Sequence, residues 1–269
     1  FFIQFLNVYA FHIFFFNFAI YISFMRFKIT LSYNGAPFCG WQIQPHAPSV
    51  QQSLNDALST LLREDISVVG AGRTDTGVNA IDYVAHFDYD KSIDTAALKY
   101  KLNAILPPSI AIKGIEETDN DFHARFSARR REYIYHIHRE KDPFAEQFSY
   151  QYSYPELDFD AMNEAAKELI GTKDFSCFEK IGADNKTSIC TVFEAYWSRD
   201  DDTHWTFHIA ADRFLRNMVR AIVGTLLEVG RGKRSPESIP ELLESGRRSN
   251  AGESVPGRAL FLSKVEYFQ

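Results

Sequence analysis

Residues 27–33 run Phe27-Lys28-Ile29-Thr30-Leu31-Ser32-Tyr33 and alternate strictly between apolar and polar side chains. A period of two residues predicts a β-strand with one buried face. Ser49 then stands as the N-cap of a helix whose apolar residues recur at helical spacing from Val50 to Leu61. Further patterns predict strands at 66–69, 81–87 and 110–115 and a helix at 95–103. The order of elements in this part is therefore β-α-β-β-α-β.

The remainder of the chain repeats that order. The patterns predict strands at 133–138, 192–197, 205–210 and 259–268 and helices at 159–170, 214–229 and 236–243. Two such units predict an α+β fold of two ferredoxin-like halves, each an antiparallel sheet with helices on one face. We expect the halves to span residues 25–130 and 131–269.

The first 24 residues differ in composition from the rest. They hold no Asp, Glu, Lys or Arg, and Phe, Ile, Asn and Tyr fill 17 of the 24 positions. The stretch is long and apolar enough to be considered as a membrane span, but polar residues such as Gln4 and His12 interrupt it. We interpret residues 1–24 as upstream sequence translated from a misplaced start, ahead of Met25 and outside the native fold. A genuine membrane anchor is the alternative.

The overall composition is that of a globular protein. Of the 269 residues, 45% are hydrophobic and 24% are charged, which excludes a disordered or low-complexity chain. The three cysteines (Cys39, Cys177 and Cys190) are far apart and form no Cys-x-x-Cys pair, so we expect neither a zinc site nor disulfides, and a reducing cytoplasmic location. The net charge of −6 argues against a generally basic coat, but it leaves room for a local basic groove.

The glycine-rich stretch Gly70–Val78 holds a single acidic residue, Asp75. A strand follows it rather than a helix, and no Gly-Lys-Ser/Thr is present, so it fits neither a dinucleotide-binding loop nor a P-loop. Asp75-Thr76-Gly77 matches the aspartic-protease triplet, but that chemistry needs a second carboxylate and the chain has no second triplet. Taken alone, the stretch also fits a turn with a surface ion pair.

Arginines gather in two other places. Arg125, Arg129, Arg130 and Arg131 stand beside aromatic residues between the halves, which fits RNA binding and a solvated basic linker equally well. On the helix expected from residue 214, Arg213, Arg216 and Arg220 fall on one side, opposite an apolar face. Within the expected helix, neither Arg216 nor Arg220 has an acidic residue four positions away, so each is free for an external anion or for a carboxylate of the other half.

Together these motifs resemble the tRNA pseudouridine synthase A family from Met25 to the C-terminus. The loop Gly72–Ala80 resembles the family's G-R-T-D-A-G-V-H-A, with Thr76 and Asn79 as departures. The other matching stretches are Tyr33-Asn34-Gly35, Phe38-Cys39-Gly40-Trp41-Gln42, Ser49-Val50-Gln51, Phe122–Ala128, Lys173-Asp174-Phe175, Phe214-Leu215, Met218-Val219-Arg220 and Gly224.

The resemblance implies an isomerase that converts uridine to pseudouridine in the anticodon stem-loop of tRNA, at nucleotides 38 to 40. It implies that Asp75 is the nucleophile and that Tyr133, Arg73 and Arg220 bind the substrate uridine. It also implies two halves with joined sheets around a central basic cleft, a homodimer, and no cofactor or metal. The arginines expected to bind tRNA are Arg125, Arg129, Arg130, Arg213 and Arg216.

The chemistry requires these residue types. The N1–C1′ bond breaks and C5 joins C1′, so the reaction needs an ionised carboxylate in a pocket closed to water. A neighbouring guanidinium favours the ionised form of that carboxylate. The routes open to Asp75 are attack on the sugar, attack on the base, or removal of a sugar proton. The base must be flipped out, and stacking on Tyr133 would recover part of the cost. Two alternatives remain: a non-catalytic RNA-binding protein, in which Asp75 is a turn residue, and an aspartic peptidase.

Overall fold

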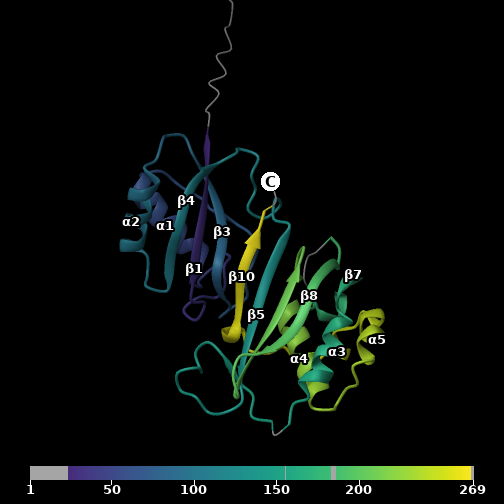
Figure 1. The fold of residues 1–269 in the computed structure, drawn as a ribbon. Helices are drawn as coiled ribbons and strands as arrows, with labels where there is room; N and C mark the ends of the chain where they lie inside the picture. The colour runs from purple at the N-terminus through teal and green to yellow at the C-terminus, as the bar shows by residue number, and fades with distance from the viewer. Residues whose placement is uncertain (1–23, 155, 183–185, 268–269) are drawn as a thin grey trace, which may run out of the picture.

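One continuous sheet runs through the middle of the protein (Figure 1). The computed structural model describes residues 24–154, 156–182 and 186–267, so the expectation for the N-terminal extension lies almost wholly outside the described residues. Within those ranges the strands follow the order β4-β1-β3-β10-β5-β9-β8-β7, with β2 on β3 and β6 on β5. The expected mixture of helices and strands around a central sheet is confirmed.

The first half places two helices against four strands. Its elements are β1 (Met25–Tyr33), α1 (Val50–Leu62), β2 (Val69–Gly70), β3 (Asn79–Tyr89), α2 (Thr95–Ile105) and β4 (Ile110–Thr118). Every second residue of β1 from Phe27 is buried, as the alternation predicts. Ser49 Oγ accepts a hydrogen bond from the backbone N–H of Gln52 at 3.2 Å, and this N-cap bond starts α1 where the sequence indicates.

The second half carries a longer series of elements. These are β5 (Arg130–His138), β6 (Tyr150–Gln151), α3 (Phe159–Lys167), β7 (Gly171–Asp174), β8 (Ile189–Arg199), β9 (His204–Ala211), α4 (Met218–Gly230), α5 (Ser238–Ser245) and β10 (Leu260–Glu266). Helix α4 is buried along nearly its whole length and packs against α3. Each half therefore has a hydrophobic core of its own.

The last strand joins the two halves. Strand β10 pairs with β5 in antiparallel fashion and with β3 in parallel, through Phe261 opposite Asn79 and Leu262 opposite Ala80. The parallel junction differs from the antiparallel sheets expected, because the chain returns from the far side of the second half to fill the gap between β3 and β5. Leu262 belongs to the core of the first half, so the C-terminal strand ties the halves together.

One predicted helix begins later than expected. The prediction that Arg213, Arg216 and Arg220 lie together on one side of this helix is therefore wrong. Asn217 has a φ of 67°, in the left-handed region, and α4 begins only at Met218. Arg213 and Arg216 therefore lie in the segment before the helix, and only Arg220 is on it. In the same way α3 ends at Lys167 rather than residue 170, and Gly171 opens strand β7, which the sequence analysis did not identify.

Candidate active site between the two halves

Asp75 lies on the loop that connects β2 to β3, on the side of the first half that faces the second. The hydroxyls of Tyr33 and Thr74 are 2.9 Å apart in a buried hydrogen bond, and the Trp41 N–H donates to the Thr74 carbonyl at 3.3 Å. A Cβ on Gly40, whose φ is +96°, would lie 2.3 Å from that carbonyl oxygen. The segment from Tyr33 to Trp41 thus packs against Thr74, the residue before Asp75, and fixes its position.

A second set of contacts fixes the far side of the loop. Asn79 Oδ1 accepts from the Gly35 N–H at 2.8 Å, and Asn79 Nδ2 donates to the Arg258 carbonyl at 2.7 Å. A Cβ on Gly257 would lie 2.6 Å from the Thr76 carbonyl oxygen. Asn79, where the resembled motif has His, therefore links the loop both to the first half and to the segment that leads into β10.

The Asp75 carboxylate faces two arginines of the second half. Arg220 Nη1 is 3.4 Å from Asp75 Oδ2, and Arg216 Nε is 3.9 Å from Oδ1. Arg220 Nε also donates to the Val255 carbonyl at 2.7 Å, which holds the plane of the guanidinium. About a quarter of both the Asp75 and the Arg220 side chain is exposed, so the pair is shielded but can be reached by a substrate.

The carboxylate does not act as a cap for its own loop. Among the described residues the carboxylate oxygens form ion pairs with Arg216 and Arg220 alone, while the Val78 N–H donates to the backbone carbonyl of Asp75 instead. Charge-assisted hydrogen bonds of this type are usually 2.7–2.9 Å long. At 3.4 and 3.9 Å the carboxylate oxygens keep room for further hydrogen bonds, which counts against a purely structural turn residue.

Tyr133 enters the same space from β5. In the sheet Tyr133 lies opposite Leu262 on β10 and Ile209 on β9. Its ring packs edge to face against Phe214, with the ring centroids 5.1 Å apart. Burial raises the pKa of Tyr133 to about 12, with the negative charge of Asp75 adding to the shift, so the hydroxyl is neutral at pH 7. Asp75, Arg220 and Tyr133 thus come together from the loop, α4 and β5.

The other sequence-predicted arginines lie at varying distances from this cluster. Arg73 is exposed, as are Arg125 and Arg129, and the side chains of Arg73 and Arg129 make no hydrogen bond or ion pair with any residue the structure describes. Arg213 donates to the Thr187 carbonyl at 3.0 Å. Arg130 is ion-paired with Glu132 and Glu194, both at 2.8 Å, and lies over the Phe193 ring.

Arg131, which the sequence grouped with arginines of an RNA-binding or solvated linker segment, connects three segments of the structure instead. Its Nη1 donates to the Asp212 carbonyl at 2.6 Å, and its Nη2 donates to the carbonyls of Ala71 at 3.0 Å and Arg125 at 2.7 Å. Burial lowers the pKa of Arg131 from its ordinary value. The three carbonyls belong to three separate segments around the cluster. The run of three arginines at 129–131 is the sequence signal at this position. Such a run does not show which guanidinium is partly buried and which is exposed.

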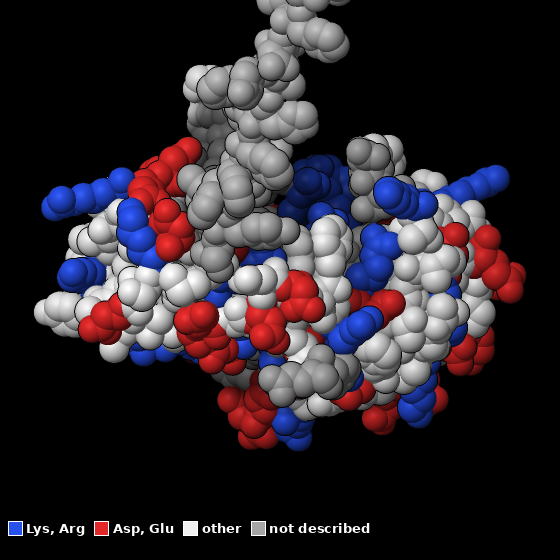
Figure 2. Space-filling model, turned by 90° about the horizontal axis from the view of Figure 1, so that it is seen from above, with Lys and Arg blue, Asp and Glu red and all other residues white. Residues whose placement is uncertain are grey.

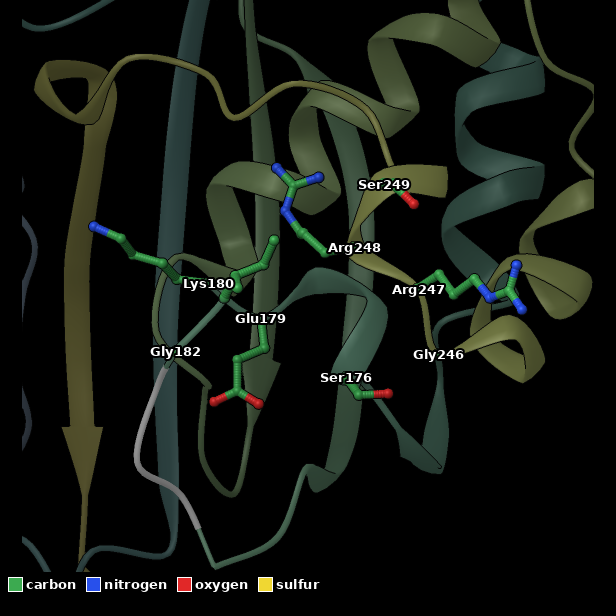
Figure 3. A pocket seen from close by; sticks show the side chains of 9 residues that line it. Ser176, Glu179, Lys180, Gly182, Gly246, Arg247, Arg248 and Ser249 are labelled. Carbon is green, nitrogen blue, oxygen red and sulfur yellow. The ribbon is translucent and has the colours of Figure 1, made fainter.

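The face of the molecule drawn in Figure 2 carries both signs of charge. Figure 2 shows Lys and Arg interspersed with Asp and Glu around the rim, and a group of basic side chains recessed near the middle. A hollow of about 390 Å³ lies beside Arg216, whose carbonyl accepts from the Lys180 N–H at 3.0 Å. The side chains of Lys180 and Arg247 point away from each other there (Figure 3), so this hollow presents no single anion site.

No group of three or more His, Cys, Asp or Glu residues in the described part of the chain could hold a metal ion. None of its helices is long and apolar enough to cross a membrane.

Comparison with known proteins identifies the family. A family model described as tRNA pseudouridine synthase matches residues 29–127 and 165–268. The chain belongs to this family. It is 50% identical over 244 residues to tRNA pseudouridine synthase A of Bacteroides thetaiotaomicron, with 90% of each chain covered. It is 43% identical over 247 residues to the enzyme of the same name in Bacillus subtilis, covering 90% of this chain and 99% of that one.

Among solved structures, a Cbf5-Nop10-Gar1 complex matches with a TM-score of 0.39 and 13% identity over 78% of this chain and 46% of that chain. The resemblance inferred from the motifs is confirmed by the family model and the curated relatives. With it, the expectation of an isomerase that acts on tRNA is confirmed at the level of the family.

Proposed function

We propose that this chain converts uridine to pseudouridine in tRNA and that the Asp75 carboxylate carries the reaction. One observation supports this most strongly: a carboxylate of the first half, with room for further hydrogen bonds, faces two guanidinium groups of the second, and the partly buried Tyr133 is close enough to feel its charge. A carboxylate used only to shape a turn would be bonded to backbone N–H groups of its own loop.

Arg220 places a positive charge beside the Asp75 carboxylate. A guanidinium at 3.4 Å interacts favourably with the negative charge that the reaction needs there. The bond from Arg220 Nε to the Val255 carbonyl fixes the plane of the guanidinium, so Nη1 faces Asp75 without a side-chain rearrangement. Arg216, with more than half of its side chain exposed, adds a second positive charge.

Tyr133 receives the flipped base. Its ring is held edge to face against Phe214, and its hydroxyl finds no hydrogen-bond partner among the described residues. A fixed aromatic ring beside the reactive carboxylate offers a stacking surface, which offsets part of the few kcal/mol needed to unstack a base. The neutral hydroxyl is free to donate a hydrogen bond to the uracil.

The reaction is an isomerisation and balances without an external reagent. The N1–C1′ bond breaks, the uracil turns, a C5–C1′ bond forms, the C5 proton leaves and N1 gains a proton. Attack of Asp75 on C1′, attack on the base and removal of a sugar proton all require the carboxylate in its ionised form. The two arginines therefore support each of the three routes.

Several finer features belong to the same proposal. We infer that the substrate uridines lie in the anticodon stem-loop, at nucleotides 38 to 40, and that the enzyme is a cytoplasmic homodimer that needs no cofactor or metal. We also infer two ferredoxin-like halves, residues 25–130 and 131–269. The strand orders β4-β1-β3-β2 and β10-β5-β9-β8 support this, since each places the last strand beside the first.

Two rival functions make different predictions. In a non-catalytic RNA-binding protein the arginines contact phosphates and no uridine is altered. A peptidase acting through Asp75-Thr76-Gly77 would need a second carboxylate close to Asp75, whereas the side chains facing Asp75 among the described residues are arginines.

The test is incubation of the purified chain with tRNA transcribed in vitro, which contains no pseudouridine, followed by mapping of modified positions. We expect pseudouridine in the anticodon stem-loop without added metal or cofactor. Tight binding with no conversion would favour the RNA-binding alternative. Conversion confined to another region of the tRNA would keep the reaction and refute the assigned substrate position.

A further inference from the structure

Phe126 is an exposed aromatic ring on a segment that is otherwise firmly held. Some 73% of its side chain is exposed, although it lies between the two halves in the stretch that leads from β4 into β5. A ring so exposed adds little to the stability of the core. Single exposed apolar residues are common, so the surroundings of the ring decide what it can do.

The turn that carries the ring is rigid. The His123 N–H donates to Ser127 Oγ, and the Ser127 N–H donates back to the His123 carbonyl, both at 2.9 Å. His123 Nδ1 accepts from the N–H groups of Arg125 at 3.1 Å and Phe126 at 3.2 Å. Burial lowers the pKa of His123, which keeps its ring neutral and Nδ1 able to accept these bonds. The ring of Phe126 is thus presented at a fixed position.

The ring is backed by an aromatic group and flanked by a positive charge. The rings of His123 and Phe126 lie 4.3 Å apart at an interplanar angle of 36°, and the Arg125 guanidinium is 5.6 Å from the Phe126 ring centroid. The side chain of Arg129, three residues on, is exposed and has no hydrogen-bond or ion-pair partner among the described residues. An exposed ring beside a guanidinium group is an arrangement that binds unpaired nucleotides.

The turn is also tied to the catalytic loop. One nitrogen of Arg131, Nη2, donates both to the carbonyl of Arg125 and to the carbonyl of Ala71, four residues before Asp75. The guanidinium is partly buried, and its bond to the Ala71 carbonyl is the more shielded of the two. A displacement of the turn relative to the Asp75 loop would break at least one of these bonds.

We propose that Phe126, backed by His123 and flanked by Arg125, stacks on an unpaired nucleobase of the tRNA whose uridine enters the site. The inference rests on the proposed function for the identity of the RNA. Flipping one base leaves its neighbours without a stacking partner, and Phe126 supplies a replacement surface at a position that Arg131 fixes relative to Asp75.

The first test compares tRNA affinity and turnover among Phe126 variants. Removing one base–aromatic stack costs about 1–3 kcal/mol, so Phe126→Ala is expected to weaken tRNA binding by about 5- to 150-fold. The loss should be larger in tRNA affinity than in the rate at saturating tRNA, since Asp75 and Arg220 are intact. Phe126→Tyr should bind normally and Phe126→Leu should not. Tyr100→Ala, which removes another ring that is 78% exposed, on α2, is the matched control and should change neither quantity.

The second test reads stacking directly. Phe126→Trp is made in the Asp75→Asn background, and tRNA is titrated while tryptophan fluorescence is recorded against the Asp75→Asn protein alone. Stacking predicts quenching that saturates with binding. Unchanged affinity in Phe126→Ala, no quenching in the Trp variant, or a changed oligomeric state in Phe126→Ala would each overturn the inference. None of these results depends on catalysis, whereas turnover by Asp75→Asn would refute the proposed function instead.

Discussion

Replacement of Arg220 tests the electrostatic basis of the site. Arg220→Leu removes the guanidinium that lies 3.4 Å from the Asp75 carboxylate. Two unit charges at that distance interact by about 1 kcal/mol in bulk water and by about 5 kcal/mol at an effective dielectric constant of about 20. With both side chains about a quarter exposed and Arg216 retained, the true value lies between these limits. Since each 1.4 kcal/mol corresponds to about a tenfold change in rate, we expect a loss of roughly 10- to 1000-fold.

The pH dependence distinguishes this loss from simple unfolding. A carboxyl group that loses a neighbouring positive charge ionises less readily, and the reaction needs the anion, so the residual rate of Arg220→Leu should rise with pH. Arg220→Lys should recover part of the rate, because an ammonium supplies the charge but cannot contact both the Val255 carbonyl and Asp75 in the planar geometry of a guanidinium.

The assay is single-turnover isomerisation of tRNA between pH 6 and pH 9. Arg234→Leu is the matched control, since Arg234 forms an ion pair of similar exposure with Glu228 at 3.1 Å, away from Asp75. That variant should keep the parent rate and profile. An Arg220→Leu enzyme with the parent rate and a flat profile would refute the role assigned to Arg220.

The remaining predictions concern tRNA binding, the loop and stability. Arg129→Ala should lower the slope of log affinity against log salt by about one ion, whereas Arg130→Ala should change it less because Glu132 and Glu194 already neutralise Arg130; equal changes would contradict this. Gly40→Ala should lower both activity and the free energy of unfolding in urea, by about 1–3 kcal/mol, because its φ is +96° and a Cβ would meet the Thr74 carbonyl. Gly72→Ala, with open space around its Cβ position, should leave the free energy of unfolding nearly unchanged. Burial lowers the pKa of His86 to about 4, so the unfolded chain takes up a proton near pH 6.5 before the folded chain does, and stability should fall between about pH 6.5 and pH 4. That slope should be smaller in His86→Gln, and an identical slope would assign the pH dependence to other groups.

Local periodicity was enough to predict most elements. The alternation at 27–33 lies within β1, and the Ser49 N-cap starts α1 at Val50. Both features depend on residues close in sequence, where one face of a strand or one cap decides the structure. The position of β10 between the halves depends on pairing with Asn79 and Ala80, far away in the sequence, and no local pattern carries that information.

The start of α4 shows the limit of a helical pattern. The apolar residues from Phe214 onward fit a helix, but the left-handed conformation of Asn217 interrupts it before Met218. Arg216 nevertheless faces Asp75 together with Arg220, because the turn before the helix brings its side chain to the same side. The sequence left both arginines open to a carboxylate of the other half, and the structure pairs them with Asp75. Arg216 reaches it from the turn before α4, however, and not from the helix.

The residues that support the site were harder to predict than those within it. Asp75, Tyr133 and Arg220 stand in motifs, whereas Arg131 acts through backbone carbonyls of Ala71, Arg125 and Asp212. A carbonyl is present at every position of the chain, so no residue type marks it as an acceptor. Only the folded structure shows that Arg125 and Arg129 are exposed whereas Arg130 and Arg131 are partly buried.

The most direct test of the account is the single-turnover rate of Asp75→Asn measured together with its affinity for tRNA. Asparagine keeps the size and polarity of the side chain and removes its charge. Asp82→Asn on β3, where Asp82 is an exposed ion-pair partner of Lys113, is the matched control and should behave like the parent enzyme. We predict no detectable pseudouridine from Asp75→Asn, with tRNA affinity within about threefold of the parent, a difference of less than ~1 kcal/mol. Appreciable conversion by Asp75→Asn would contradict the claim that this carboxylate carries the reaction.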